Sequence, residues 1–131
     1  MRVARFVAWS VALALVVSAS GCALLVFGAG AAAGVGTVAY MKGELKATKE
    51  ATLAKAIKAT ELAMKDMQLP ITERQETASH AKFVVRASGD KRIEINLQKL
   101  SGTVTEIRIR VGVFGDEALS RLALEKIEKR L

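Results

Sequence analysis

The chain contains one cysteine, Cys22, and the stretch that precedes it has the features of an export signal. Two arginines give a positive start, and residues 6–17 form an uncharged, mostly apolar run. The small residues 18–21 complete the three parts of a secretory signal. A single Cys also excludes an internal disulfide, so the exported part must fold through packing and hydrogen bonding alone. The sequence therefore predicts a signal peptide over residues 1–21 and a small exported chain after it.

The four residues Ala19-Ser20-Gly21-Cys22 resemble a bacterial lipobox, the motif in which the Cys thiol is acylated and becomes the new N-terminus. Ser20, Gly21 and Cys22 match the motif, whereas Ala19 stands where Leu is usual. The resemblance implies lipidation of Cys22, and two or more acyl chains hold a protein stably on a membrane. Two alternatives stay open: an uncleaved N-terminal membrane helix, and ordinary cleavage that releases a protein with a free thiol.

Residues 23–41 carry no charge and are rich in glycine and alanine. We expect residues 22–41 to form the lipidated Cys and an apolar tether. A segment of this length is also long enough to span a bilayer. Gly30 and Gly34 have the small-xxx-small spacing that lets helices pack closely in lipid. A segment that inserts into the membrane and oligomerises is therefore the alternative interpretation.

In residues 42–131, segments with the two-residue hydrophobic period of strands alternate with segments that have the period of helices, which predicts a domain of strands and helices. The alternation of half-buried strands is found at 42–50, 81–87, 92–100 and 103–113, with a shorter polar strand at 71–77. Helical periodicity predicts helices at 52–69, between an N-cap Thr52 and Pro70, and at 117–131, after an N-cap Asp116. We expect an α+β fold of two layers, with one antiparallel sheet and two helices on one face. The expected order is β-α-β-β-β-β-α.

The same alternation assigns strand residues to two faces of the sheet. Phe83, Ile95 and Ile107 represent the inward, apolar set. The outward set is polar with a basic excess, and from it we select three candidate contacts for an anionic lipid or envelope polymer: Arg86, Arg108 and Arg110. The alternative is that this face is merely solvated.

Charge and composition limit the classes of function. The formal net charge of +7 favours anionic surfaces as partners. Aromatic residues make up 5% of the chain, and no stacking platform for nucleic acid is visible. His80 is the one histidine, and no nucleophile stands beside a base in the sequence. We expect no catalytic, cofactor or metal site, no enzyme activity and no nucleic-acid partner.

Two stretches, Tyr40-Met-Lys-Gly-Glu-Leu45 and residues 105–120, resemble a family of short bacterial lipoproteins of uncharacterised function. The family combines a signal peptide, a lipobox Cys, a Gly/Ala-rich apolar stretch and one small domain. The resemblance implies a lipid-anchored protein of the cell envelope and no assigned activity. Ala23 follows the Cys where lipoproteins of the inner membrane usually have Asp, so we expect the outer membrane, facing the periplasm. An uncleaved N-terminal helix would instead place the protein in the inner membrane.

These inferences give one leading functional prediction. We expect a membrane-anchored, non-enzymatic structural or interaction module that meets an unidentified protein or an anionic surface. The alternative is a membrane-active component whose segment 23–41 inserts and oligomerises.

Overall fold

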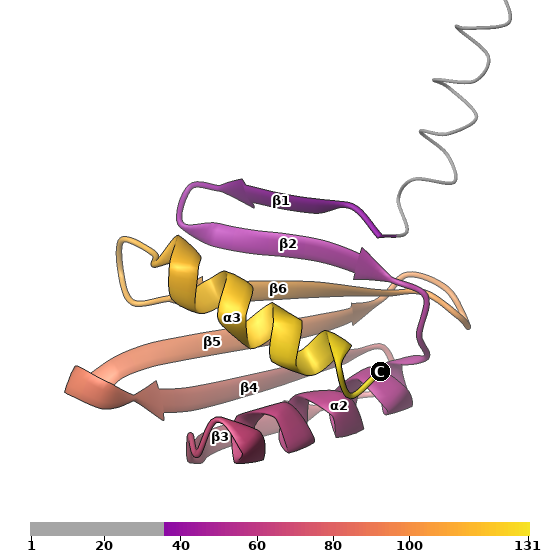
Figure 1. Ribbon diagram of the computed structural model, residues 1–131. Helices are drawn as coiled ribbons and strands as arrows, with labels where there is room; N and C mark the ends of the chain where they lie inside the picture. Colours follow the sequence, from indigo (N-terminus) through magenta and orange to yellow (C-terminus); the bar gives the residue numbers. More distant parts are fainter. Residues whose placement is uncertain (1–35) are drawn as a thin grey trace, which may run out of the picture. The chain divides into compact units, whose positions relative to one another are not determined.

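The computed structural model describes residues 36–131, which form one six-stranded sheet and two helices (Figure 1). The elements are, in chain order, β1 (Val38–Met41), β2 (Glu44–Lys49), α2 (Leu53–Asp66), β3 (Ile71–Glu76), β4 (His80–Ala87), the 3₁₀ turn η1 (Ser88–Asp90), β5 (Lys91–Lys99), β6 (Thr105–Val111) and α3 (Glu117–Glu128). The predicted signal peptide, Cys22, Gly30 and Gly34 lie outside the described residues.

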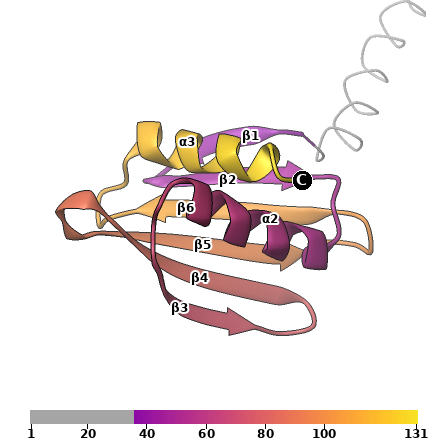
Figure 2. The same cartoon turned by 60° about the horizontal axis from the view of Figure 1, so that its bottom comes forward.

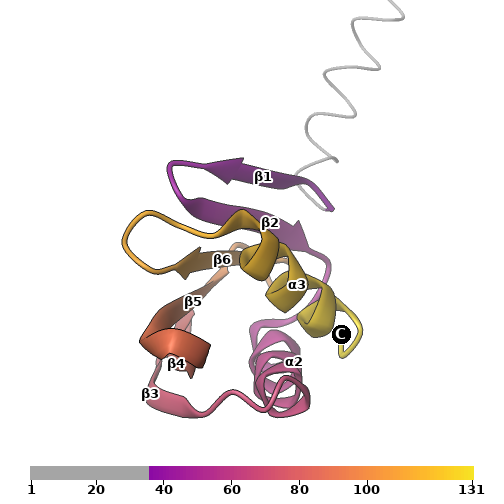
Figure 3. The ribbon, with the colours of Figure 1, turned by 60° about the vertical axis from the view of Figure 1, so that its left-hand side comes forward.

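The sheet is antiparallel throughout, with the strand order β1-β2-β6-β5-β4-β3. Strand β6 is the last strand in the sequence but lies between β2 and β5 in the sheet. It therefore joins the N-terminal hairpin of β1 and β2 to the meander of β3, β4 and β5. Helix α3 packs on β2 and β6, and α2 packs on β4 and β5. Both helices cover the same face of the sheet (Figures 2 and 3). The predicted two-layer fold and its element order are confirmed, with β1 added in front.

The core lies between this face and the helices, and the predicted inward residues form it. Nine predicted inward strand residues are at most 2% exposed: Phe83, Val85, Ile93, Ile95, Leu97, Thr105, Ile107, Ile109 and Val111. Ala56 and Ala63 of α2 and Ala123 of α3 are completely buried, and their small side chains let the helices approach the strands. The buried Thr105 hydroxyl donates to Ala51 O at 2.8 Å, which satisfies it inside the core.

Helix α2 ends at Asp66, three residues before the end predicted from the position of Pro70. Gln68 has a φ of +56°. Its N–H donates to Lys65 O at 3.0 Å, and the Leu69 N–H donates to Met64 O at 2.9 Å. These two bonds form a Schellman motif, so backbone capping ends the helix before proline could do so.

The N-terminal hairpin differs from the single strand predicted over residues 42–50. Lys42 and Gly43 have φ values of +53° and +79°. Two successive residues with positive φ form the two-residue turn that matches the twist of a β-hairpin. Strand β2 therefore begins at Glu44, and Val38–Met41 pairs with β2 as an additional edge strand. The sheet thus includes four residues that the sequence assigns to the tether.

Candidate functional site

Three large apolar side chains are exposed at one end of the sheet, where two loops meet. Met41 is 68% exposed beside the β1–β2 turn, and Val113 and Phe114 are 85% and 95% exposed in the β6–α3 loop. We call these three residues the apolar tip. Figures 1 and 3 show the two loops side by side at this end. Large apolar side chains that gather on an exposed loop junction mark a contact site more often than isolated ones do.

Two glycines hold the loops of the tip against each other. A Cβ added at Gly115 would lie 2.5 Å from Tyr40 Oη and 2.6 Å from Gly43 O. A Cβ added at Gly43 would lie 2.8 Å from Phe114 O. Both glycines also have positive φ, at +84° and +79°. Only glycine allows this close backbone approach, so the tip is built on a closely packed junction.

The β6–α3 loop is also fixed at both of its ends. The Gly112 N–H donates to Arg92 O at 2.8 Å, which ties the loop to β5. Asp116 caps α3 by accepting from the Leu119 N–H at 3.0 Å, and Lys91 Nζ lies 3.0 Å from its other carboxylate oxygen. The backbone N–H of Leu119 and the ammonium of Lys91 lower the pKa of Asp116. The predicted capping role of Asp116 is confirmed, and the exposed pair of residues 113–114 lies between two anchored ends.

The three arginines selected from the sequence all lie on the open face of the sheet, each beside an acidic residue. Arg86 Nη1 lies 3.1 Å from Asp90, Arg108 Nε lies 2.5 Å from Glu106, and Arg110 Nε lies 3.9 Å from Glu44. Arg108 and Arg110 are neighbours on β6, whereas Arg86 lies two strands away on β4. Arg108 and Arg110 therefore form one pair of adjacent cations, Arg86 stands apart from them, and each of the three has an acidic neighbour.

Carboxylates in the middle of the open face continue this pattern. The Glu106 side chain is only 8% exposed and also meets Lys46 Nζ at 3.2 Å. Glu94 accepts from the Asn96 amide at 3.1 Å and lies 3.4 Å from Lys82 Nζ, and both contacts lower its pKa. The cations of these pairs are more exposed than Glu106, at 52% for Lys46 and 44% for Arg108, and ion pairs open to solvent on one side contribute little stability each. The open face is therefore a mixed surface, on which Glu106 is shared by Lys46 and Arg108 and Glu94 is shared by Lys82 and Arg92.

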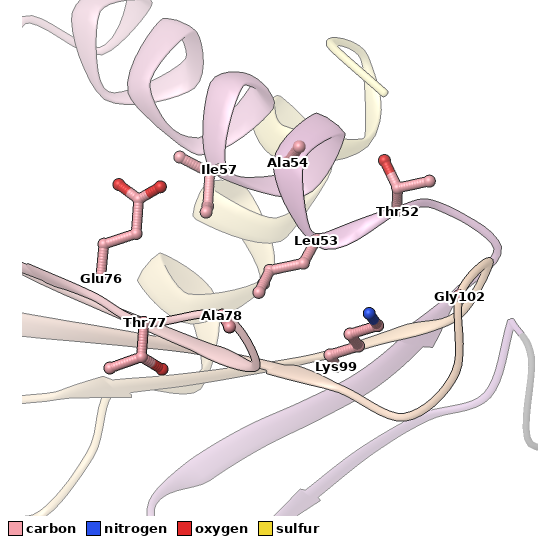
Figure 4. Close-up of a pocket in the computed structure, with 9 residues that line it drawn as sticks. All are labelled: Thr52, Leu53, Ala54, Ile57, Glu76, Thr77, Ala78, Lys99 and Gly102. Carbon is pink, nitrogen blue, oxygen red and sulfur yellow. The ribbon is translucent and has the colours of Figure 1, made fainter.

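A pocket of about 330 Å³ lies at the opposite end of the sheet, below the start of α2 (Figure 4). Leu53 and Ile57 form its apolar wall, and Glu76 and Lys99 lie at its two sides. Thr52 accepts from the Lys55 N–H at 3.2 Å, so this hydroxyl serves as the helix cap. In the part of the chain that the structure describes, no three His, Cys, Asp or Glu side chains gather into a metal-binding group.

Sequence reasoning missed the apolar tip because it extended the last strand through Val113. Strand β6 ends at Val111, since Gly112 has a φ of +66° and turns the chain out of the sheet. The available signal was the spacing Gly112-Val-Phe-Gly115 directly before a helix cap. Two large apolar residues between glycines indicate a loop that exposes them.

The described unit belongs to the class of two-layer α+β domains with one open antiparallel sheet. Residues 6–130 match a family described as protein of unknown function (DUF3568), and the chain belongs to this family. No match is found among curated proteins. Within residues 36–131, neither helix has the length and apolar content needed to cross a bilayer.

Proposed function

We propose that this protein is a membrane-anchored lipoprotein of the bacterial cell envelope that serves as a non-enzymatic interaction module. The sequence supports the anchor, because a complete export signal leads directly into Cys22. The domain then carries its contact site at the apolar tip. An outer-membrane location facing the periplasm is part of the proposal, because Ala23 follows the Cys.

The apolar tip is the observation that carries the interaction role. Its most exposed side chain, Phe114, projects from a junction that the contacts of Gly43 and Gly115 hold in place. Because the backbone of this loop is already held in place, binding does not have to order the loop, and an aromatic side chain presented in this way suits insertion into a pocket. Its charged neighbours Lys91 and Arg110 lie 3.0 Å from Asp116 and 3.9 Å from Glu44. Two of the three cations at this end are therefore paired with acids, and the third, Lys42, stands in the β1–β2 turn itself. The partner we propose for the exposed aromatic side chain is an apolar pocket on a protein rather than an anionic lipid surface.

The direction of the chain also fits this role. Residue 36 leads into β1 at one end of the sheet, and the apolar tip lies at the other end (Figure 1). A domain held through its N-terminal side therefore has its contact residues at the end remote from the attachment point. The alternative, insertion of residues 23–41, would involve the part before Gly36, because the backbones of Gly36 and Thr37 bond to Thr48 and β1 pairs with β2.

The anchor is tested by labelling cells with a palmitate analogue and determining the mass of the mature N-terminus. We expect label on the wild type, and we expect Cys22→Ser to be unlabelled and to accumulate as the uncleaved precursor. An unlabelled wild type with a mature N-terminus at another residue would rule out the lipoprotein assignment. A Gly30→Leu, Gly34→Leu variant tests the alternative, because only an oligomerising segment would lose self-association in membranes.

The interaction role is tested by crosslinking intact cells and purifying the tagged, full-length protein. We expect a defined protein adduct that disappears in Phe114→Ser. Leu100→Ser is the matched control, because Leu100 is 53% exposed in the loop after β5 at the other end of the sheet. Loss of the adduct in both variants, or in neither, would argue against the apolar tip as the contact site.

A further inference from the structure

We propose that β1 is a self-pairing edge, through which two copies of this chain join their sheets into one. The two edges of the described sheet differ in chemistry. Strand β3, Ile71–Glu76, carries Glu73, Arg74 and Glu76 and has a register irregularity between Ile71 and Glu73. Charges and bulges of this kind prevent edge-to-edge pairing in natural sheets. Strand β1 is Val-Ala-Tyr-Met and has no charge, proline or bulge.

Side-chain contacts also cover part of the β3 edge. Arg74 pairs with Glu61 of α2 and lies 2.8 Å from Glu76, and its guanidinium is 5.6 Å from the centre of the Phe83 ring. These contacts fix a charged side chain over the β3 side of the core. On β1, Val38 is 38% exposed, and α3 packs over β2 and β6. The uncharged edge is therefore also the less protected one.

The hairpin register determines which backbone groups of β1 point outward. Met41 and Glu44 flank the two-residue turn and form a hydrogen-bonded pair, after which such pairs recur at every second residue. The bond from the Thr48 N–H to Thr37 O, at 3.2 Å, fits this alternation. The N–H and C=O groups of Val38 and Tyr40 consequently face away from β2.

This arrangement matches a second copy of itself. An antiparallel pairing centred on Ala39 places Val38 of each copy opposite Tyr40 of the other copy. Both are residues whose backbone groups point outward, so two reciprocal pairs of hydrogen bonds form. Val38 and Tyr40 lie on the helix side of the sheet in both copies. Each Val38 side chain would therefore contact the Tyr40 ring of the other copy, a favourable aromatic–β-branched pair. The twofold axis gives the isologous interface that closed dimers use.

The pairing is tested first by disulfide formation in the full-length protein. The Ala39 residues of the two copies would lie opposite each other as a non-hydrogen-bonded pair. Their Cα atoms would be about 4.5 Å apart, a distance that a disulfide can bridge. Ala39→Cys should therefore form a covalent dimer under mild oxidation. Gln75→Cys, an exposed position on the β3 edge, is the matched control, and the parent chain reports any dimer that Cys22 forms. Equal dimer yields from Ala39→Cys and either control would overturn the proposal.

A second measurement avoids cysteine chemistry. Light scattering of the purified full-length protein in detergent should give a protein mass twice that of one chain. Ala39→Lys places two like charges on the twofold axis, and we expect it to halve this mass. Because Ala39 is exposed, the far-ultraviolet circular dichroism should stay unchanged. A wild type with the mass of one chain, or an Ala39→Lys variant with the mass of two, would refute β1 pairing.

Discussion

Replacing Gly115 by alanine is expected to destabilise the domain through two separable effects. The first is the backbone conformation, because φ at Gly115 is +84°, where a Cβ costs about 1–2 kcal/mol. The second is overlap, because the new Cβ would lie 2.6 Å from Gly43 O and 2.5 Å from Tyr40 Oη. Relieving such overlap costs about 1–3 kcal/mol. We expect the free energy of unfolding to fall by about 2–5 kcal/mol.

Gly89→Ala is the matched control for this prediction. Gly89 has a φ of +75°, and no atom lies within 4 Å of the position that its Cβ would take. It should therefore show only the backbone effect, about 1–2 kcal/mol. Urea unfolding of both full-length variants, followed by far-ultraviolet circular dichroism, gives the comparison. Equal losses for the two variants would mean that the β1–β2 turn does not pack on Gly115.

Three further predictions follow from the strands and the helix cap. Ile107→Ala should lower the free energy of unfolding by about 2–5 kcal/mol in urea melts, because its side chain is fully buried. Arg108→Ala should lower it by less than about 1 kcal/mol, because Glu106 still forms its ion pair with Lys46. Equal losses for the two variants would mean that the strand register is wrong. The pKa of Asp116 is lowered in the fold, so its contribution is complete above the unfolded value of about 3.9 and is lost as the pH falls through the lower folded value. Asp116→Asn, which keeps a capping side chain but removes the charge, should therefore flatten the acid side of the stability curve below about pH 4. An unchanged curve would mean that the Leu119 N–H and Lys91 do not stabilise the Asp116 charge. Arg74→Ala should increase hydrogen exchange in β3 more than in β5, because it removes the link from β3 to Glu61; uniform exchange would show that this link does not hold the edge.

The central strands could be predicted from the sequence because alternation and burial coincide there. In β5, Ile93, Ile95 and Leu97 are completely buried, and the polar residues between them point to the open face. Side chains of a strand alternate strictly, so this pattern determines both the strand and its inward face.

The edge strand and the tip could not be predicted in this way. Three of the four residues of β1 are exposed, so burial leaves no alternating signature in Val38–Met41. The pattern Val111-x-Val113 continues the alternation of β6, although the positive φ of Gly112 has already ended the strand. The junction of Gly43 with Gly115 joins residues far apart in the chain, and only the pairing of β2 with β6 brings them together.

The ion pairs of the open face could not be predicted from the sequence pattern either. The sequence correctly places Arg108 and Arg110 outward, but it does not show which carboxylates lie beside them. Glu44 lies opposite Arg110 only because β2 pairs with β6 in this register. The prediction that these arginines contact an anionic surface therefore depends on whether an external anion can compete with the neighbouring acids.

The most direct test of the account is a photoreactive amino acid placed at position 114 in the full-length protein, in living cells. We expect a discrete crosslinked protein partner after illumination, and none when the same amino acid replaces Leu100 at the other end of the sheet. Attachment mainly to lipid from position 114, or the same products from both positions, would contradict the proposal that the apolar tip binds a protein pocket.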